Sequence, residues 1–142
     1  MPLFCREKDM VDVFCRILVG QGYEVFREVA YYGRRIDVLA VFEDQFWAYE
    51  AKLTQWPRAL DQAHWHVTAV DYSSVVLPLP LAKRVEHQIF RTYQIGLVGL
   101  SEDTWFPLVE PVTSPLNWPP AKEQLARTVQ SFRNTRNSLC IL

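Results

Sequence analysis

The chain is poor in cysteine and has neither a long apolar run nor an excess of positive charge. Its three cysteines, Cys5, Cys15 and Cys140, form no CxxC pair, so we expect free thiols rather than a disulfide framework or a cysteine-bound metal. The apolar runs fall far short of the roughly 20 residues of a membrane span. Charged residues begin at Arg6, which is not typical of a signal peptide. These absences favour a cytoplasmic protein without membrane contact.

The charges are nearly balanced, with 15 Lys and Arg residues against 16 Asp and Glu residues. A protein that coats nucleic acid is usually basic, so this balance counts mildly against such a role without excluding it. Metal-binding acids lower the total charge, and basic residues can still cluster locally. Apolar residues make up 49% of the 142 positions, which indicates a folded chain rather than a disordered one. We expect a single domain over residues 1–142.

Two apolar segments separated by an acidic pair predict a β-hairpin in the first half of the chain. Residues 34–42 and 45–53 each suit a buried or half-buried strand, and Glu43-Asp44 suits a two-residue turn. Such a turn pairs Phe42 with Gln45 and so sets the register of the two strands. The register decides which side chains face one another across the hairpin.

Three charged side chains stand in these apolar strands, where a charge is rarely buried without a partner. The register places Asp37 directly opposite Glu50 on one face of the sheet, with Cβ atoms about 4.5–5.5 Å apart. Lys52 shares the face of Glu50, one step along the strand. Two carboxylates at this separation repel each other, and a divalent cation between them would convert the repulsion into a binding site.

A pair of acids with an amine beside it suits metal-assisted hydrolysis of a phosphodiester. Carboxylate oxygens are ligands that Mg²⁺ and Mn²⁺ prefer, so Asp37 and Glu50 are the candidate metal ligands. The metal would polarise the phosphate and help to form hydroxide from a bound water. Lys52 would position or deprotonate that water and stabilise the charge that develops on the phosphate.

The alternative is that Glu50 and Lys52 lie on a solvent-facing edge of the sheet. Polar residues would then be expected at every second position. The face on which they lie is instead apolar, since it carries Leu39, Val41, Phe46 and Ala48. The pattern therefore favours a largely buried site.

The rest of the chain alternates between helical and strand periodicity. A helix of some ten residues follows the hairpin and predicts a parallel addition to the sheet, because parallel strands need a crossover connection. A core of about residues 7–100 is followed by a proline-rich connector and a closing helix over residues 107–136. The predicted elements are, in order, a helix over 6–20, a strand over 23–29, the hairpin, a helix over 56–69, a strand over 72–78, a helix over 83–94, strands over 95–100 and 104–109, and a helix over 121–133.

Two further polar residues are candidates for the site, each with an ordinary structural alternative. Glu7 begins the apolar stripe of the first helix, where it could stabilise the helix N-terminus or reach the acid pair. Gln62, in the helix after the hairpin, could orient a phosphate or water, or lie exposed. It shares a helix face with His66, four residues on. His64 and His66 are two residues apart, so they point in different directions, and we do not expect them to bind metal.

With these elements and residues placed, the chain resembles the PD-(D/E)XK nuclease superfamily, which has the restriction-endonuclease-like fold. It is similar to small Holliday-junction-resolvase-like and uncharacterised members. The resemblance implies an α/β fold with an αβββαβ core, a mixed central sheet flanked by helices, and here an extra C-terminal helix. The residues that match are 35–40, which include Asp37, then Glu50-Ala51-Lys52, and Gln62 within 59–63.

The resemblance also implies a role for each matching residue. Asp37, Glu50 and the backbone carbonyl of Ala51 would bind Mg²⁺ or Mn²⁺, and Lys52 would be the catalytic lysine. Gln62 would be a supporting helix residue, and Glu7 would match the first-helix acid of some branches. The chain departs from the family name at Ile36, which stands where the proline would be, and it has no cysteine set for an iron–sulfur cluster.

Two functional hypotheses from different classes follow. The first is a metal-dependent DNA endonuclease that hydrolyses phosphodiester bonds, with Asp37, Glu50, Lys52 and Gln62 as its catalytic residues. The second is a catalytically silent nuclease-like module that binds or scaffolds within a DNA-processing or defence complex. A core of this size often needs help to grip a duplex, so a second copy of the chain and a protein partner are expected alternatives alongside DNA.

Overall fold

The computed structural model describes the backbone of residues 2–141 and the side chains of residues 2–136. The two terminal positions of the predicted domain, residues 1 and 142, lie outside the described residues, as does the Cys140 thiol. Cys5 and Cys15 are free thiols. In the described part of the chain, the helices are all too short or too polar to cross a membrane.

Helices and strands alternate in the order α-β-β-β-α-β over the first six elements, as the sequence predicted. The chain has the α/β fold class, with one mixed six-stranded sheet. The elements of the described chain are α1 (Glu7–Gly20), β1 (Glu24–Tyr31), β2 (Arg34–Phe42), β3 (Gln45–Ala51), α2 (Trp56–His66), β4 (Tyr72–Pro78), α3 (Leu79–Arg84), α4 (His87–Tyr93), β5 (Gly96–Leu100), β6 (Trp105–Val109) and α5 (Pro119–Ile141).

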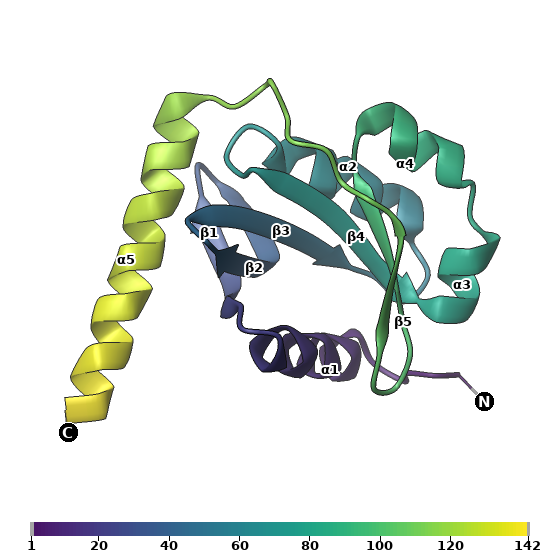
Figure 1. Ribbon diagram of the computed structural model, residues 1–142, viewed down its shortest axis with the longest axis horizontal. Coiled ribbons are helices and arrows are strands. Elements are labelled where there is room, and N and C mark those ends of the chain that lie inside the picture. Colours follow the sequence, from purple (N-terminus) through teal and green to yellow (C-terminus); the bar gives the residue numbers. More distant parts are fainter. Residues whose placement is uncertain (1, 142) are drawn as a thin grey trace.

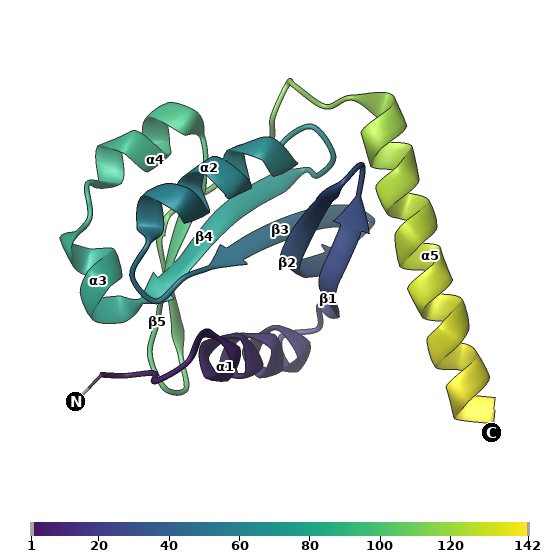
Figure 2. The same cartoon turned by 180° about the vertical axis from the view of Figure 1, so that it is seen from behind.

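The six strands lie side by side in the order in which they occur in the chain. β1, β2 and β3 form an antiparallel meander, β4 and β5 add in parallel, and β6 returns antiparallel to β5. Helix α1 lies on one side of the sheet, and α2, α3 and α4 lie on the other (Figures 1 and 2). The predicted parallel addition of the fourth strand is confirmed.

The sheet is apolar on both faces because helices cover both. On one face, Phe14 of α1 packs edge-on against Tyr49 of β3, with ring centroids 4.8 Å apart. On the other face, Ala63 of α2 lies in the same buried cluster as Val75 and Leu77 of β4. Strands covered on both faces have nearly continuous apolar sequences. A charged residue in β2 or β3 therefore stands in an apolar setting.

The turn between β2 and β3 sets the predicted register. Glu43 and Asp44 both have positive φ, 51° and 63°, which is the backbone of a two-residue hairpin turn that matches the twist of the strands. Phe42 pairs with Gln45, and regular pairing continues as far as Val38 with Tyr49. The predicted register of the hairpin is therefore confirmed.

One predicted helix is wrong, because residues 83–94 belong to two short helices. Val85 has an extended backbone, with φ −71° and ψ 158°, and it ends α3. The side chain of Glu86 then accepts a hydrogen bond from the backbone N–H of Gln88 and caps α4. The apolar spacing continues across this break, so periodicity alone did not show it.

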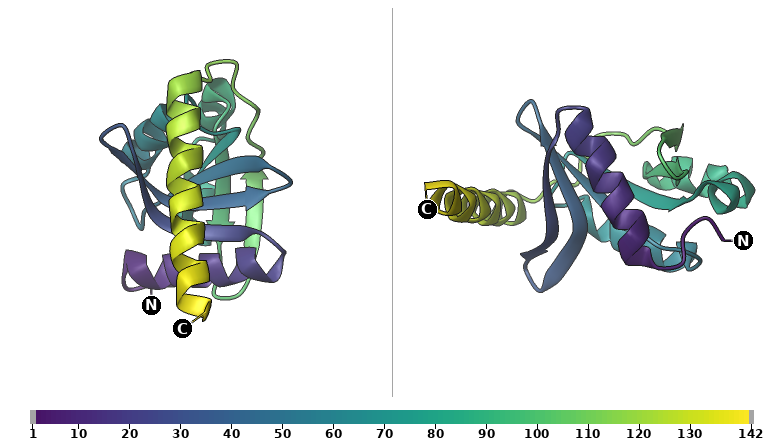
Figure 3. Two further views of the ribbon diagram at one scale, coloured as in Figure 1. Left: turned by 90° about the vertical axis from the view of Figure 1, so that its left-hand side faces the viewer. Right: turned by 90° about the horizontal axis from the view of Figure 1, so that it is seen from below.

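The closing helix α5 begins at Pro119, two residues before the predicted start, and lies outside β1 at one end of the sheet (Figure 3). Arg133 forms a bidentate ion pair with Glu24 of β1, with the shortest N–O distance 2.6 Å. The guanidinium of Arg136 lies 4.3 Å from the ring centroid of Phe26 and donates to the carbonyl of Val25. These contacts add to the apolar packing of α5, whose Ala121, Leu125 and Val129 lie in one buried cluster with residues of β1, β2 and β3.

The positive φ of Asp44 generates a stability prediction. Glycine adopts this backbone without strain, so Asp44→Gly should stabilise the fold by about 0.5–1 kcal/mol. Arg16→Gly, an exposed change in the middle of α1, is the control and should destabilise by about 1 kcal/mol. Chemical denaturation of the two variants and the parent chain measures both values. A loss of stability in Asp44→Gly would contradict the turn assignment.

Candidate active site

The acid pair lies where β2 and β3 separate. Regular pairing ends at Val38 with Tyr49, so Asp37 and Glu50 occupy the next level of the hairpin. The backbone N–H of Asp37 donates to Oε2 of Glu50 at 2.9 Å. The backbone N–H of Ala51 donates to Oδ2 of Asp37 at 3.1 Å. Each carboxylate thus accepts a hydrogen bond from a backbone N–H of the opposite strand, and these two bonds hold the acids side by side.

The neighbouring strand is distorted at the same level. In β1, Glu28 stands between the pairs of Arg27 with Val38 and Val29 with Ile36. Glu28 has φ 53°, an uncommon left-handed conformation for a residue with a side chain. Backbone strain of this kind clusters at functional sites. Three adjacent strands therefore each carry an acid at the level where their regular pairing is interrupted.

The backbone of Ala51 also faces the acid pair. Its N–H points toward β2, since it donates to Asp37. The neighbouring N–H of Lys52 points the other way and donates to Val76 of β4. The N–H and C=O of one strand residue point to the same side, so the Ala51 carbonyl also points toward β2. Its direction matches the predicted role of a backbone ligand.

Two hollows open beside the pair, and Arg35, Asp37 and Lys52 line both of them. The first, here the α1 hollow, has a volume of about 200 Å³. The second, here the α2 groove, has a volume of about 470 Å³. Besides the shared residues, the α1 hollow is lined by Glu7, Lys8, Val11, Arg27, Glu28 and Ala51. The α2 groove is lined by Gly33, Arg34, Arg58, Gln62, Trp65 and His66.

The candidate residues thus share one region of the surface, with one exception. Asp37 and Lys52 line both hollows, Glu7 lines the α1 hollow and Gln62 lines the α2 groove. Glu50 lines neither, because it is only 1% exposed. Its contact with the lining residues is the hydrogen bond that its Oε2 accepts from the backbone N–H of Asp37.

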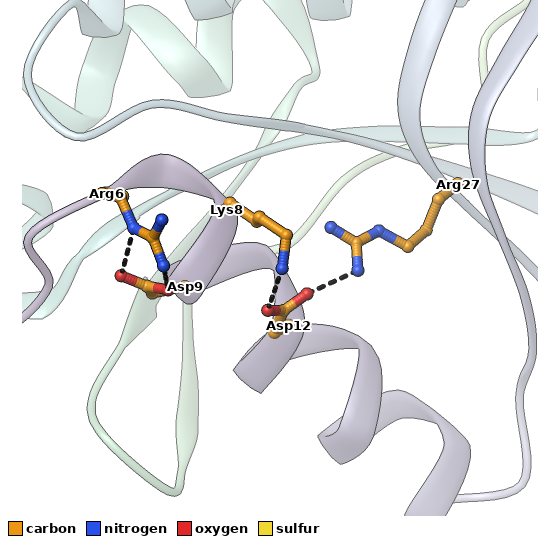
Figure 4. Close-up of polar contacts among 5 residues, drawn as sticks. All are labelled: Arg6, Lys8, Asp9, Asp12 and Arg27. Carbon is orange, nitrogen blue, oxygen red and sulfur yellow. Dashed lines mark hydrogen bonds and ion pairs between the residues drawn. The ribbon is translucent and has the colours of Figure 1, made fainter.

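The basic residues of the α1 hollow are largely neutralised by acids on α1 and β1. Lys8 and Arg27 converge on the carboxylate of Asp12, and Arg6 pairs with Asp9 nearby (Figure 4). In the α2 groove, by contrast, Arg34 and Arg58 form no ion pair with any described side chain, and neither does Lys52, which lines both hollows. The free positive charge therefore lies on the α2 side of Asp37.

A histidine and a tyrosine complete the buried part of the site, and sequence reasoning missed both. His66 of α2 is buried, with Nε2 3.4 Å from Oε1 of Glu50 and Nδ1 2.7 Å from the hydroxyl of Tyr31. At 3.4 Å the contact with Glu50 lacks hydrogen-bond geometry, so it is a close approach of the two groups. The shared helix face of Gln62 and His66 was the available sequence signal, and nothing pointed to Tyr31.

Gln62 contributes an oxygen without a partner in the described chain. Its Oε1 is buried and accepts no hydrogen bond there, which is costly for a polar atom. The side chain lines the α2 groove together with Asp37 and Lys52. A water or an ammonium group in the groove would satisfy this oxygen.

Burial and the neighbouring acid change the ionisation of Asp37. Removal from water, and then the charge of Glu50, raise the pKa of Asp37 to about 6, although the Ala51 N–H and Lys52 act in the opposite direction. Burial also raises the pKa of the Tyr31 hydroxyl, so this group stays protonated and can donate to His66. A cation at Asp37 would compete with the proton that the raised pKa favours.

The donor set suits a hard divalent cation in kind. It consists of two carboxylates and one backbone carbonyl, and oxygen donors are those that Mg²⁺ and Mn²⁺ take. Among the described side chains, no group of three or more His, Cys, Asp or Glu residues could enclose a metal. Mg²⁺ is commonly bound by one or two carboxylates together with waters and substrate phosphates. The residues present fit such an open site.

Comparison with known proteins supports the fold alone. No family model and no curated protein matches the chain. The structure is similar to that of SPO1766, a protein of unknown function from Silicibacter pomeroyi, with a TM-score of 0.72 and 14% sequence identity. The similarity covers 94% of this chain and 89% of that one. The two proteins share the α/β architecture.

The raised pKa of Asp37 predicts a pH-dependent stability in the presence of a chelator. A folded-state pKa above the unfolded value of about 3.9 contributes stability below about pH 4 that is lost as the pH rises through about 6. Relative to Asp37→Asn, the parent chain should lose on the order of 2 kcal/mol between about pH 4 and about pH 7. Urea unfolding at both pH values measures this difference. Parallel pH profiles would show that Asp37 titrates normally.

Proposed function

We propose that this protein is a metal-dependent endonuclease that hydrolyses phosphodiester bonds in DNA, with a site like that of the PD-(D/E)XK nucleases. The observation that carries the proposal is the pair Asp37 and Glu50, held together by backbone hydrogen bonds beside Lys52. Two carboxylates on adjacent strands of an apolar sheet destabilise the fold unless a ligand or a function offsets their burial and repulsion. Binding of a divalent cation is such a function.

Each residue of the site has a chemical task in this proposal. Asp37 reaches both hollows and would hold Mg²⁺ or Mn²⁺ together with Glu50 and the Ala51 carbonyl. When bound, the metal supplies Lewis acidity toward a phosphate oxygen and lowers the pKa of water. Lys52 would orient the attacking water and stabilise the negative charge of the transition state. Gln62 would accept a hydrogen bond from that water through its unpartnered oxygen.

The charge around the site supports an anionic polymer as substrate. The α2 groove is lined by four basic residues and, among its lining residues, one acid, Asp37. The basic residues are Arg34, Arg35, Lys52 and Arg58. Arginine and lysine contacts to phosphates supply most of the sequence-independent affinity for nucleic acid. The net charge of −1 is therefore compatible with DNA, because the basic residues are concentrated beside the acid pair.

A cleavage assay tests the proposal. Purified protein is incubated with plasmid and single-stranded DNA in Mg²⁺ or Mn²⁺. We expect cleavage by the parent chain, and a loss of at least about 100-fold in Asp37→Asn and in Lys52→Met, because each removes a group that acts in the transition state. Lys83→Met on α3 is the matched control and should cut normally. Equal cutting by all four proteins, or none by the parent chain, would refute the proposal.

A second candidate is the catalytically silent binding module, which one observation favours. Glu50 is buried and lines neither hollow, because Oε2 accepts from the backbone N–H of Asp37 and Oε1 lies 3.4 Å from Nε2 of His66. If the carboxylate stays in this position, a metal ion would have Asp37 and the Ala51 carbonyl as ligands. DNA binding that needs no metal and leads to no cleavage would select this candidate over the nuclease.

A further inference from the structure

Three exposed aromatic side chains stand on the three segments that meet at the tip of the hairpin between β1 and β2. They are Tyr32 in the turn, Trp65 near the end of α2 and Trp118 just before α5, which are 49%, 50% and 52% exposed. The rings of Tyr32 and Trp118 are in contact, with centroids 5.4 Å apart. We call these three residues the aromatic patch. Large apolar side chains grouped on a surface commonly mark a binding site.

The patch is held in place by the backbone around it. The N–H of Trp118 donates to the carbonyl of Thr68, just beyond α2, at 2.7 Å. The N–H of Tyr32 donates to the side chain of Gln124 on α5 at 2.7 Å. The hairpin tip, the end of α2 and the start of α5 are thus tied together, so the rings are presented on a fixed surface.

Arg34 connects the aromatic patch to the α2 groove. Its guanidinium lies 4.1 Å from the ring centroid of Trp65, a cation–π contact. Arg34 and Trp65 both line the groove that also contains Asp37 and Lys52. The surface therefore runs from the ring of Trp65, past Arg34, to Asp37.

This combination matches the chemistry of a single nucleic acid strand. Rings offer stacking surfaces to bases and arginines pair with phosphates, and the two together are typical of sites for unpaired strands. A base inside a duplex is stacked on its neighbours and cannot lie flat on a side chain. A protein partner would explain the rings, but not their continuity with a groove that is rich in arginine.

We propose that the aromatic patch binds unpaired bases of single-stranded DNA, whose backbone lies along the α2 groove past Arg34 and Arg58. The substrate class is then DNA with a single-stranded segment next to the phosphate at Asp37. This specificity rests on the proposed nuclease function, whereas the binding itself needs neither metal nor cleavage.

Binding in a chelator tests the inference separately from catalysis. Fluorescence anisotropy compares a labelled single strand of roughly 16 nucleotides with the duplex of the same sequence. We expect tighter binding of the single strand, and a roughly tenfold weaker affinity for it in Trp65→Ala, with little change for the duplex. Phe106→Ala is the matched control, because Phe106 is 41% exposed on β6 at the other edge of the sheet, and it should bind like the parent chain.

A second variant keeps the test decisive if Trp65→Ala unfolds. Trp118→Ala removes a ring at the surface next to α5 and should also weaken single-strand binding. Tighter binding of the duplex, or unchanged binding by both tryptophan variants, would overturn the inference. So would a dimer of the parent chain that Trp65→Ala dissociates in sedimentation, since the patch would then be a protein interface. Single-strand binding without any cleavage would keep the inference and remove only the nuclease.

Discussion

The structure depends on one electrostatic constraint: two carboxylates occupy the same level of an apolar sheet. Asp37 and Glu50 stand where β2 and β3 separate, and backbone N–H groups of Asp37 and Ala51 take the place of ordinary strand pairing. The arrangement leaves Asp37 with a pKa of about 6, because burial and Glu50 both disfavour its charge. A site that resists ionisation in this way gains most from a cation.

The two hollows beside this acid pair differ in how far their basic residues are neutralised, so they would attract an anion unequally. On the α1 side, Asp12 neutralises Lys8 and Arg27. On the α2 side, Arg34 and Arg58 form no ion pairs in the described chain, and the groove that they line also contains the exposed ring of Trp65. The proposed polyanionic substrate would therefore approach Asp37 along the α2 groove. Helices pack on both faces of the sheet, so the same strands carry both sides of the site.

Local patterns predicted much of this arrangement, and long-range contacts account for the rest. The turn residues Glu43-Asp44 set a register that could be extended by counting to Asp37 opposite Glu50. By contrast, the complete burial of Glu50 depends on how α2 packs on the sheet, which brings His66 against it. The strained backbone of Glu28 likewise leaves no mark in composition or periodicity. The spacing of apolar residues within a helix or strand does not reveal which distant element it will contact.

The most direct test of the account is a calorimetric titration of Mn²⁺ into the protein near neutral pH. We predict saturable binding by the parent chain, with at least about tenfold weaker affinity in Asp37→Asn and in Glu50→Gln, because each removes one charged oxygen donor. Glu43→Gln, an exposed acid in the neighbouring turn, should bind like the parent chain. Binding that is absent from the parent chain, or that is equally strong in Glu50→Gln, would contradict a cation site at the acid pair.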